Sequence, residues 1–241
     1  MKKGYLSLLL LLSMASLPTG LLAQNLKIYS LTGLTVGSPL GEIPEGATGA
    51  PGTDIHLGLS FVGRLATMPA WSLGLDAIYT RQKSTYASPI TGETTVSTEV
   101  FGIDLSWPFP VSYEGQAEGA YDNRYREFDL WIRRGQNRWQ GGIGVYYAQL
   151  IKGQNKGAVD IRVANLFNIE NEPFDESAFV NTQDWGLLAG FSVRVFWRAS
   201  LYFRAKVGMM PVMSQNPEGL EGIYRNVYLS TGVKFLLLDL P

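Results

Sequence analysis

Apolar and polar residues alternate strictly along many segments of this chain. Such a period of two is typical of β-strands with one apolar and one polar face. In a soluble sandwich the polar faces meet water and carry many charges, whereas only 17% of these residues are charged. The pattern therefore favours a transmembrane barrel, whose apolar faces meet lipid. One such segment alternates as Asp54, Ile55, His56, Leu57, Gly58, Leu59, Ser60 and Phe61.

The alternation predicts an all-β fold, an antiparallel up-and-down transmembrane β-barrel of about ten strands. Eight and twelve strands are the alternatives, because the long connection at 108–120 has room to conceal a further strand pair. The expected strands are 26–37, 53–67, 71–85, 94–107, 121–134, 138–151, 157–168, 184–197, 199–210 and 222–237.

The connections in this series are of two kinds, short and long. Long ones are expected at 38–52, 82–93, 168–183 and 211–221, and short ones at 67–70, 135–137, 152–156 and 197–199. With the first strand running outward from the periplasm, these four long connections fall outside the cell, as is usual for such barrels. The long connection at 108–120 is the exception, because this threading puts it in the periplasm. Tryptophans gather at membrane interfaces. This threading puts Trp71, Trp107 and Trp197 at the periplasmic end and Trp139 and Trp185 at the outer end.

The first residues read as a secretory signal peptide. Lys2 and Lys3 precede an apolar core at Leu8 to Leu12, and Ala23 ends a plausible cleavage site. The expected division is a signal peptide at 1–23 and a barrel domain at 24–241. The chain has no cysteine, which excludes disulfides and thiolate metal sites. Its formal net charge of −1 makes nucleic acid an unexpected partner.

The polar faces of the predicted strands carry charges of both signs. In a barrel of eight to ten strands the interior is just wide enough to be filled by side chains. We therefore expect these charges to pair with one another inside the lumen, and a narrow ion-conducting path is the alternative. The expected lumen charges are Arg64, Asp76, Asp104, Glu127, Asp129, Arg133, Asp160, Arg162, Arg194, Arg204, Lys206 and Lys234.

His56 is the only histidine, and the alternation puts it on the same face as Asp54. An aspartate that orients a histidine is one element of a hydrolase site. Outer-membrane lipases and deacylases use a His-x-Ser pairing, however, and Gly58 stands at that position. The expected role of His56 is a polar lumen residue, and no catalytic, cofactor-binding or metal-binding residue is assigned.

Five acids near one long connection raise a separate question about calcium, which prefers oxygen ligands. They lack the spacing of an EF-hand, so a solvated acidic loop is the favoured interpretation. These acids are Glu170, Glu172, Asp175, Glu176 and Asp184.

The last predicted strand, Asn226 to Phe235, the leader ending at Ala23 and Gln24, and the weakly alternating strands carry a family resemblance. With these features the chain resembles the small outer-membrane β-barrel domain proteins of the PorT-like kind. The resemblance implies the fold of a barrel and a location in the bacterial outer membrane, far more than it implies any activity. One departure is that the chain continues beyond Phe235 to Pro241, whereas outer-membrane barrels usually end on an aromatic residue.

Together these features predict an outer-membrane β-barrel that is not an enzyme and that needs no cofactor. Its expected role is structural, adhesive or accessory to a complex, through its long extracellular loops. A narrow channel for small solutes or ions is the first alternative, and a barrel hydrolase using His56 and Asp54 is the second. The expected partners are outer-membrane lipid and other envelope proteins, with no nucleic acid.

Overall fold

The computed structural model describes residues 25–41, 46–94, 97–100, 103–106, 111–136, 138–163, 167–213 and 224–240. The predicted signal peptide at 1–23 lies outside these residues. Within them, no helix is long and apolar enough to cross a membrane. The elements are β1 (Leu26–Gly41), β2 (Thr48–Arg64), β3 (Trp71–Thr94), β4 (Ser97–Val100), β5 (Ile103–Ser106), β6 (Val111–Gln136), β7 (Trp139–Lys152), β8 (Asn155–Val163), β9 (Phe167–Asp175), the 3-10 helix η1 (Ser177–Phe179), β10 (Gln183–Arg194), β11 (Ala199–Pro211) and β12 (Tyr224–Leu240).

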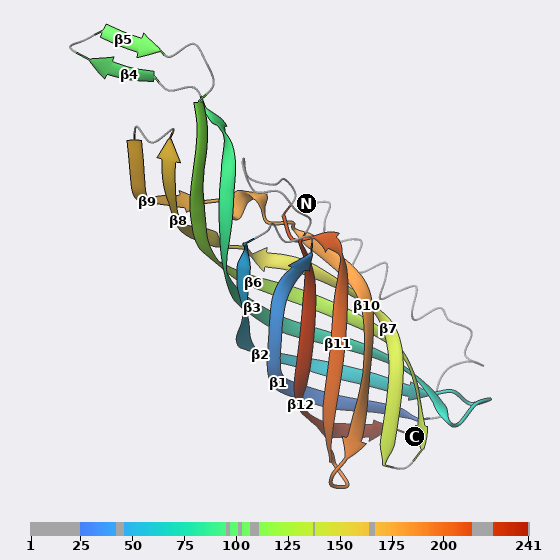
Figure 1. Cartoon of the computed structure of the whole chain (residues 1–241). Coiled ribbons are helices and arrows are strands. Elements are labelled where there is room, and N and C mark those ends of the chain that lie inside the picture. Colours follow the sequence, from blue (N-terminus) through green and yellow to red (C-terminus); the bar gives the residue numbers. More distant parts are fainter. Residues whose placement is uncertain are drawn as a thin grey trace.

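Eight of these strands close into a ring. The order around the sheet is β3-β2-β1-β12-β11-β10-β7-β6, and pairing of β3 with β6 completes the circle (Figure 1). Every pair is antiparallel, and each strand lies beside the next ring strand along the chain. This confirms an up-and-down β-barrel. The same sheet continues from β6 onto β8 and β9, so ten strands share it within the described residues while eight form the wall.

The alternation of the sequence becomes an alternation of environment across this wall. On β2, buried His56 and Ser60 point inward, whereas Leu57 and Leu59 are 55% and 43% exposed on the outer surface. The predicted outward set behaves alike, with its members exposed or half-buried on the outside. An outer apolar surface around a charged interior is the arrangement of a transmembrane β-barrel. This set comprises Leu57, Leu59, Leu73, Leu75, Phe191, Val193, Leu201 and Phe203.

Two predicted barrel strands, 94–107 and 157–168, lie outside the ring. β4 and β5 pair with each other in a separate two-stranded sheet, and β8 pairs with β6 beyond the end of β7. Because the first of these segments does not cross the barrel, every later strand up to β7 runs opposite to the predicted direction. The expected connection at 108–120 was also wrong, since its described residues 111–120 belong to β6 and extend from the same end as the other long connections.

Of the four predicted short turns, the one at 152–156 was placed wrongly: it lies at the end of the barrel where β8 pairs with the outer part of β6, here named the loop end. The other three lie together at the opposite end, here named the turn end. The turns link β2 to β3, β6 to β7 and β10 to β11. Trp139 opens β7 at the turn end, which corrects its predicted place at the outer end. It lies there with Trp71 and Trp197, while Trp185 lies near the loop end. Trp107 is outside the described residues.

β3 and β6 are much longer than a barrel wall needs. They have 24 and 26 residues, against the roughly 9 to 11 that cross a bilayer. Their mutual pairing continues to Thr94 and Val111, whereas the pairing of β2 with β3 ends at Ala87. The outer parts of β3 and β6 together with β8 and β9, here named the arm, extend from the loop end as a sheet (Figure 1).

The last strand is longer than predicted. β12 continues past Phe235 to Leu240, which pairs with Leu26 of β1. A register shift between Ile28 and Tyr29 accommodates one extra residue of β12 opposite them. The residues that looked like a short tail after Phe235 therefore complete the seam of the barrel, as far as the structure describes them.

Candidate functional site

The centre of the lumen holds a network of buried ion pairs built around Asp76 of β3. Its side chain is fully buried and accepts hydrogen bonds from the Trp131 indole at 2.9 Å, from Arg133 at 3.0 Å and from Arg204 at 2.6 Å. Trp131 and Arg133 project from β6, next to β3, whereas Arg204 projects from β11 on the other side of the ring. Asp76 therefore ties opposite walls of the barrel together.

A second layer of the network lies next to the first. Asp129 of β6 accepts from Arg204 at 3.0 Å and from Lys206 at 2.9 Å, and Lys206 also pairs with Glu127. Because both cations come from β11 and both acids from β6, this layer forms another brace across the lumen. Buried charges need such paired and hydrogen-bonded partners to offset their loss of hydration.

Seven of the twelve predicted lumen charges are buried inside the ring, so the alternation identified most of the network. Arg64 and Arg194 are exposed at the turn end. The remaining three were predicted wrongly, because β5 and β8 are not strands of the barrel wall. The seven buried residues are Asp76, Glu127, Asp129, Arg133, Arg204, Lys206 and Lys234. The three outside the ring are Asp104 on β5 and Asp160 and Arg162 on β8.

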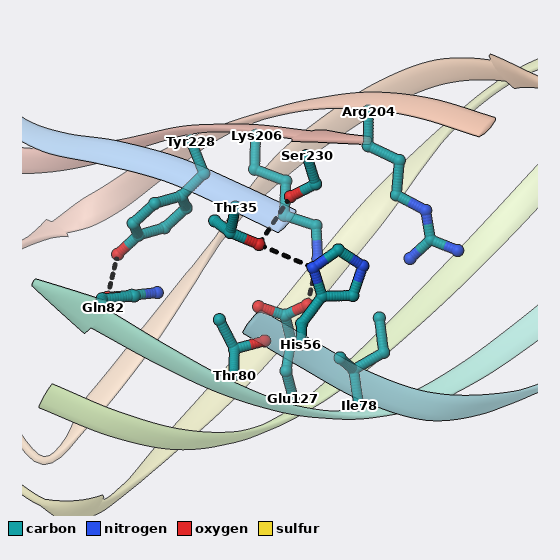
Figure 2. Close-up of a pocket in the computed structure, with 10 residues that line it drawn as sticks. All are labelled: Thr35, His56, Ile78, Thr80, Gln82, Glu127, Arg204, Lys206, Tyr228 and Ser230. Carbon is teal, nitrogen blue, oxygen red and sulfur yellow. Dashed lines mark hydrogen bonds and ion pairs between the residues drawn. The ribbon is translucent and has the colours of Figure 1, made fainter. Parts of the chain in front are cut away.

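His56 lies in the lumen, as predicted, but its partners are hydroxyl groups. Its Nδ1 is 2.8 Å from Thr35 Oγ1 on β1, and its Nε2 is hydrogen-bonded to the Tyr202 hydroxyl on β11. The Asp54 carboxylate lies 3.5 Å from Arg81 instead. With both ring nitrogens occupied and only 2% of the residue exposed, His56 links three strands. Figure 2 shows the imidazole between Thr35 and Arg204, one of the side chains that cross the lumen.

Inward-facing aromatic rings fill the remaining space, and sequence reasoning did not single them out. Each lies against a glycine, where an added Cβ would stand only 2.5 to 3.2 Å from a ring or hydroxyl atom. A side chain larger than glycine would therefore clash with the ring, so these glycines make room for the aromatic side chains. The sequence did contain a signal for these rings, because they stand at the positions that the alternation turns toward the lumen. The pairs are Tyr228 with Gly37, Tyr146 with Gly186, Tyr202 with Gly232, and Trp131 with Gly190.

The described lumen is consequently almost full. Figure 2 shows the cavity beside His56 and Lys206. The volume in which the centre of a water molecule can lie there is about 10 Å³. That is enough for about one water molecule. Nearer the loop end, Val212 is buried above Tyr228, and Met213 pairs with Val180 in an isolated bridge. Side chains of the described residues therefore obstruct the lumen at its centre and toward the loop end.

The five acids considered for calcium are not gathered into one site. Asp184 points into the lumen, where it accepts from Tyr146 and Asn226 at 2.9 Å each. Asp175 lies at the end of β9, and hydrogen bonds from Lys156 and Ser177 lower its pKa to about 2. The described residues contain no group of three or more acidic or histidine side chains suited to a metal ion.

Three solved structures illustrate what this chain is similar to. Neisserial surface protein A has a TM-score of 0.35 at 14% identity over 88% of this chain and 97% of that one. Ail, the attachment invasion locus protein of Yersinia pestis, has 0.37 at 7% over 89% and 99%. The outer membrane protein OprG from Pseudomonas aeruginosa has 0.36 at 14% over 90% and 98%. No family model and no curated protein matches the chain. The strand ring of this chain defines its fold independently of these likenesses.

Proposed function

We propose that this protein is a barrel of the bacterial outer membrane that holds a rigid arm at the cell surface, where the arm binds another envelope or surface protein. The apolar outer wall and the charged interior support the membrane setting. The turn end then faces the periplasm and the loop end faces outward, because short periplasmic turns and long outer loops are usual. The role is structural, adhesive or accessory to a complex, without enzymatic activity.

The filled lumen supports an anchor in preference to the two alternatives. A narrow channel requires a continuous polar path, whereas Arg204, Asp76 and Lys206 bridge opposite walls. A hydrolase requires substrate to reach its base, whereas His56 is buried between Thr35 and Tyr202. The cross-lumen ion pairs instead make the barrel a stiff base.

The arm is the observation that carries this proposal. It continues the barrel wall without a flexible joint, because β3 and β6 stay paired at every residue from Trp71 and Arg134 to Thr94 and Val111. Such a long surface projection on a rigid scaffold is where binding function is concentrated.

Cross-strand aromatic contacts stiffen the arm. Tyr86 and Tyr121 have ring centroids 5.0 Å apart, and the Tyr113 ring covers Gly92 so closely that an added Cβ would lie 2.5 Å from its hydroxyl oxygen. Beyond the barrel, β9 has a free edge in the described sheet, since β8 is its one partner there. An extended segment of a protein partner can pair with such an edge.

The test compares cross-linking from the arm with cross-linking from the turn end. A photoreactive residue is placed at exposed Thr91 or Glu118, and the control position is exposed Met68 in the turn between β2 and β3. In intact cells, the arm positions should give one discrete protein adduct that Met68 does not give. Adducts of equal pattern from all three positions, or none from the arm, would refute a binding role for the arm.

A shortened variant supplies the functional readout. Replacing residues 89–116 by a two-residue turn joins β3 to β6 just above the barrel, at the Ser88 and Ala117 pair. The variant, which retains Glu118, should keep the heat-modifiable gel migration of a folded barrel and lose the adduct from Glu118 together with any adhesion. Retained adhesion in a folded variant would contradict the proposal.

A further inference from the structure

A small polar vestibule opens at the turn end of the lumen, away from the arm. Arg133 and Lys234 line its buried part, and Arg138 and Arg194 line its exposed rim. Ser192 and Ser200 contribute hydroxyl groups from β10 and β11. The space measures about 20 Å³ for the centre of a water-sized sphere, which is room for one or two waters or for one small anion.

The charges that line this vestibule are all positive. Four cationic side chains surround it, and the nearest network acid, Asp76, is already shared by Arg133 and Arg204. The acid described near this end on β12, Asp239, is paired with Lys27 at 2.8 Å. Accumulated positive charge without a counter-charge is unfavourable in a space shielded from water.

One hydrogen-bond donor in this region is buried without a partner. Arg133 is 4% exposed, and its Nη2 donates to both oxygens of Asp76, at 3.1 and 3.0 Å. Its Nη1 has no hydrogen-bond partner among the described residues. A buried guanidinium nitrogen in that state costs free energy unless a ligand or a water molecule accepts a hydrogen bond from it.

The exposed rim is held in position by the backbone. Arg138 lies in the turn between β6 and β7, and its Nε donates to the carbonyl of Arg194 at 3.3 Å. The Arg194 amide donates back to the Arg138 carbonyl at 2.8 Å. The Arg138 guanidinium is thus held at the mouth beside the backbone of Arg194, which reduces the entropy that this group loses when it binds a ligand.

We infer that the vestibule binds a phosphate-type oxyanion. Guanidinium groups match the oxygens of phosphate with paired, charge-assisted hydrogen bonds, and Lys234 and the serine hydroxyls offer further donors. The phosphate group comes either from free inorganic phosphate or from the headgroup of an anionic phospholipid at the same membrane face. Both sources present the same chemistry to the four cations.

The experiment titrates inorganic phosphate into the folded protein in a neutral maltoside detergent, with calorimetry as the readout. We expect saturable binding that the Arg138→Gln, Arg194→Gln double variant weakens by about tenfold or more, because two charge-assisted contacts are lost. The control is Arg198→Gln, which removes one charge at the same end. Its guanidinium lies 4.1 Å from the Trp197 ring centre and does not line the vestibule.

A second experiment distinguishes the two sources of phosphate. The wild type and the double variant are reconstituted in phosphatidylcholine vesicles with and without phosphatidylglycerol, and thermal unfolding is followed. Stabilisation by phosphatidylglycerol that the double variant loses assigns the site to a headgroup, and its absence beside saturable phosphate binding assigns it to the free ion. Absence of both effects, or equal weakening by Arg198→Gln, would overturn the inference.

Discussion

Removal of the Asp76 carboxylate tests the buried network most severely. In Asp76→Ala, Arg204 keeps its 3.0 Å contact with Asp129, whereas Arg133 loses the carboxylate that both of its described hydrogen bonds reach. Breaking a buried pair by removing one partner costs about 3 to 5 kcal/mol, since the remaining charge is left uncompensated. In Asp76→Asn an amide oxygen still accepts one or two bonds, so we expect a loss of about 2 kcal/mol.

The assay is reversible urea unfolding in lipid vesicles, followed by tryptophan fluorescence, with Asp239→Asn as the control. Asp239 pairs with Lys27 on the surface, and exposed pairs contribute about 0 to 1 kcal/mol. Arg133→Met should reduce the penalty of Asp76→Ala, because no unpaired guanidinium remains. A loss below about 1 kcal/mol for Asp76→Ala would refute the bracing role of the network.

Three further predictions concern the wall and the lumen. Leu59→Arg places a charge on the lipid face and should destabilise the barrel by about 2 to 4 kcal/mol if it lies near the bilayer midplane, as measured by unfolding in vesicles. Gly37→Ala would put a Cβ 2.5 Å from the Tyr228 ring and should cost about 1 to 3 kcal/mol, whereas Gly141→Ala, which meets no atom closer than 3.9 Å, should be nearly neutral in the same assay. His56→Ala should leave heat-modifiable migration intact and remove no lipase, deacylase or protease activity; loss of such an activity in a folded variant would favour the hydrolase alternative.

The sequence predicted the barrel because lipid-facing alternation is a local property. Leu57 and Leu59 point outward and His56 inward, as their period of two requires. It failed where apolar residues become sparse, since the polar stretches around Tyr86 and Glu118 carry too weak an alternation to reveal a long hairpin.

The candidate site was predictable only in part, because pairing across a barrel joins distant strands. Alternation identified Asp76 and Arg204 as inward, but their contact spans 128 positions of sequence. The same limit explains why Asp54 was considered for His56. Both face inward from one strand, yet the partner of His56 is Tyr202, which ring closure brings from β11. The vestibule formed by Arg138 and Arg194 likewise depends on two turns that meet only in the folded barrel.

Electrical recording in planar bilayers tests most directly whether the barrel is a closed anchor. Purified protein should give no steady conductance, because ion pairs and aromatic rings cross the described lumen and the cavity beside His56 measures only about 10 Å³. Asp76→Ala is recorded beside the wild type, since this change removes the carboxylate at the centre of the ion pairs that obstruct the lumen. Stable and reproducible single-channel steps from the wild type would contradict the account and support the narrow channel.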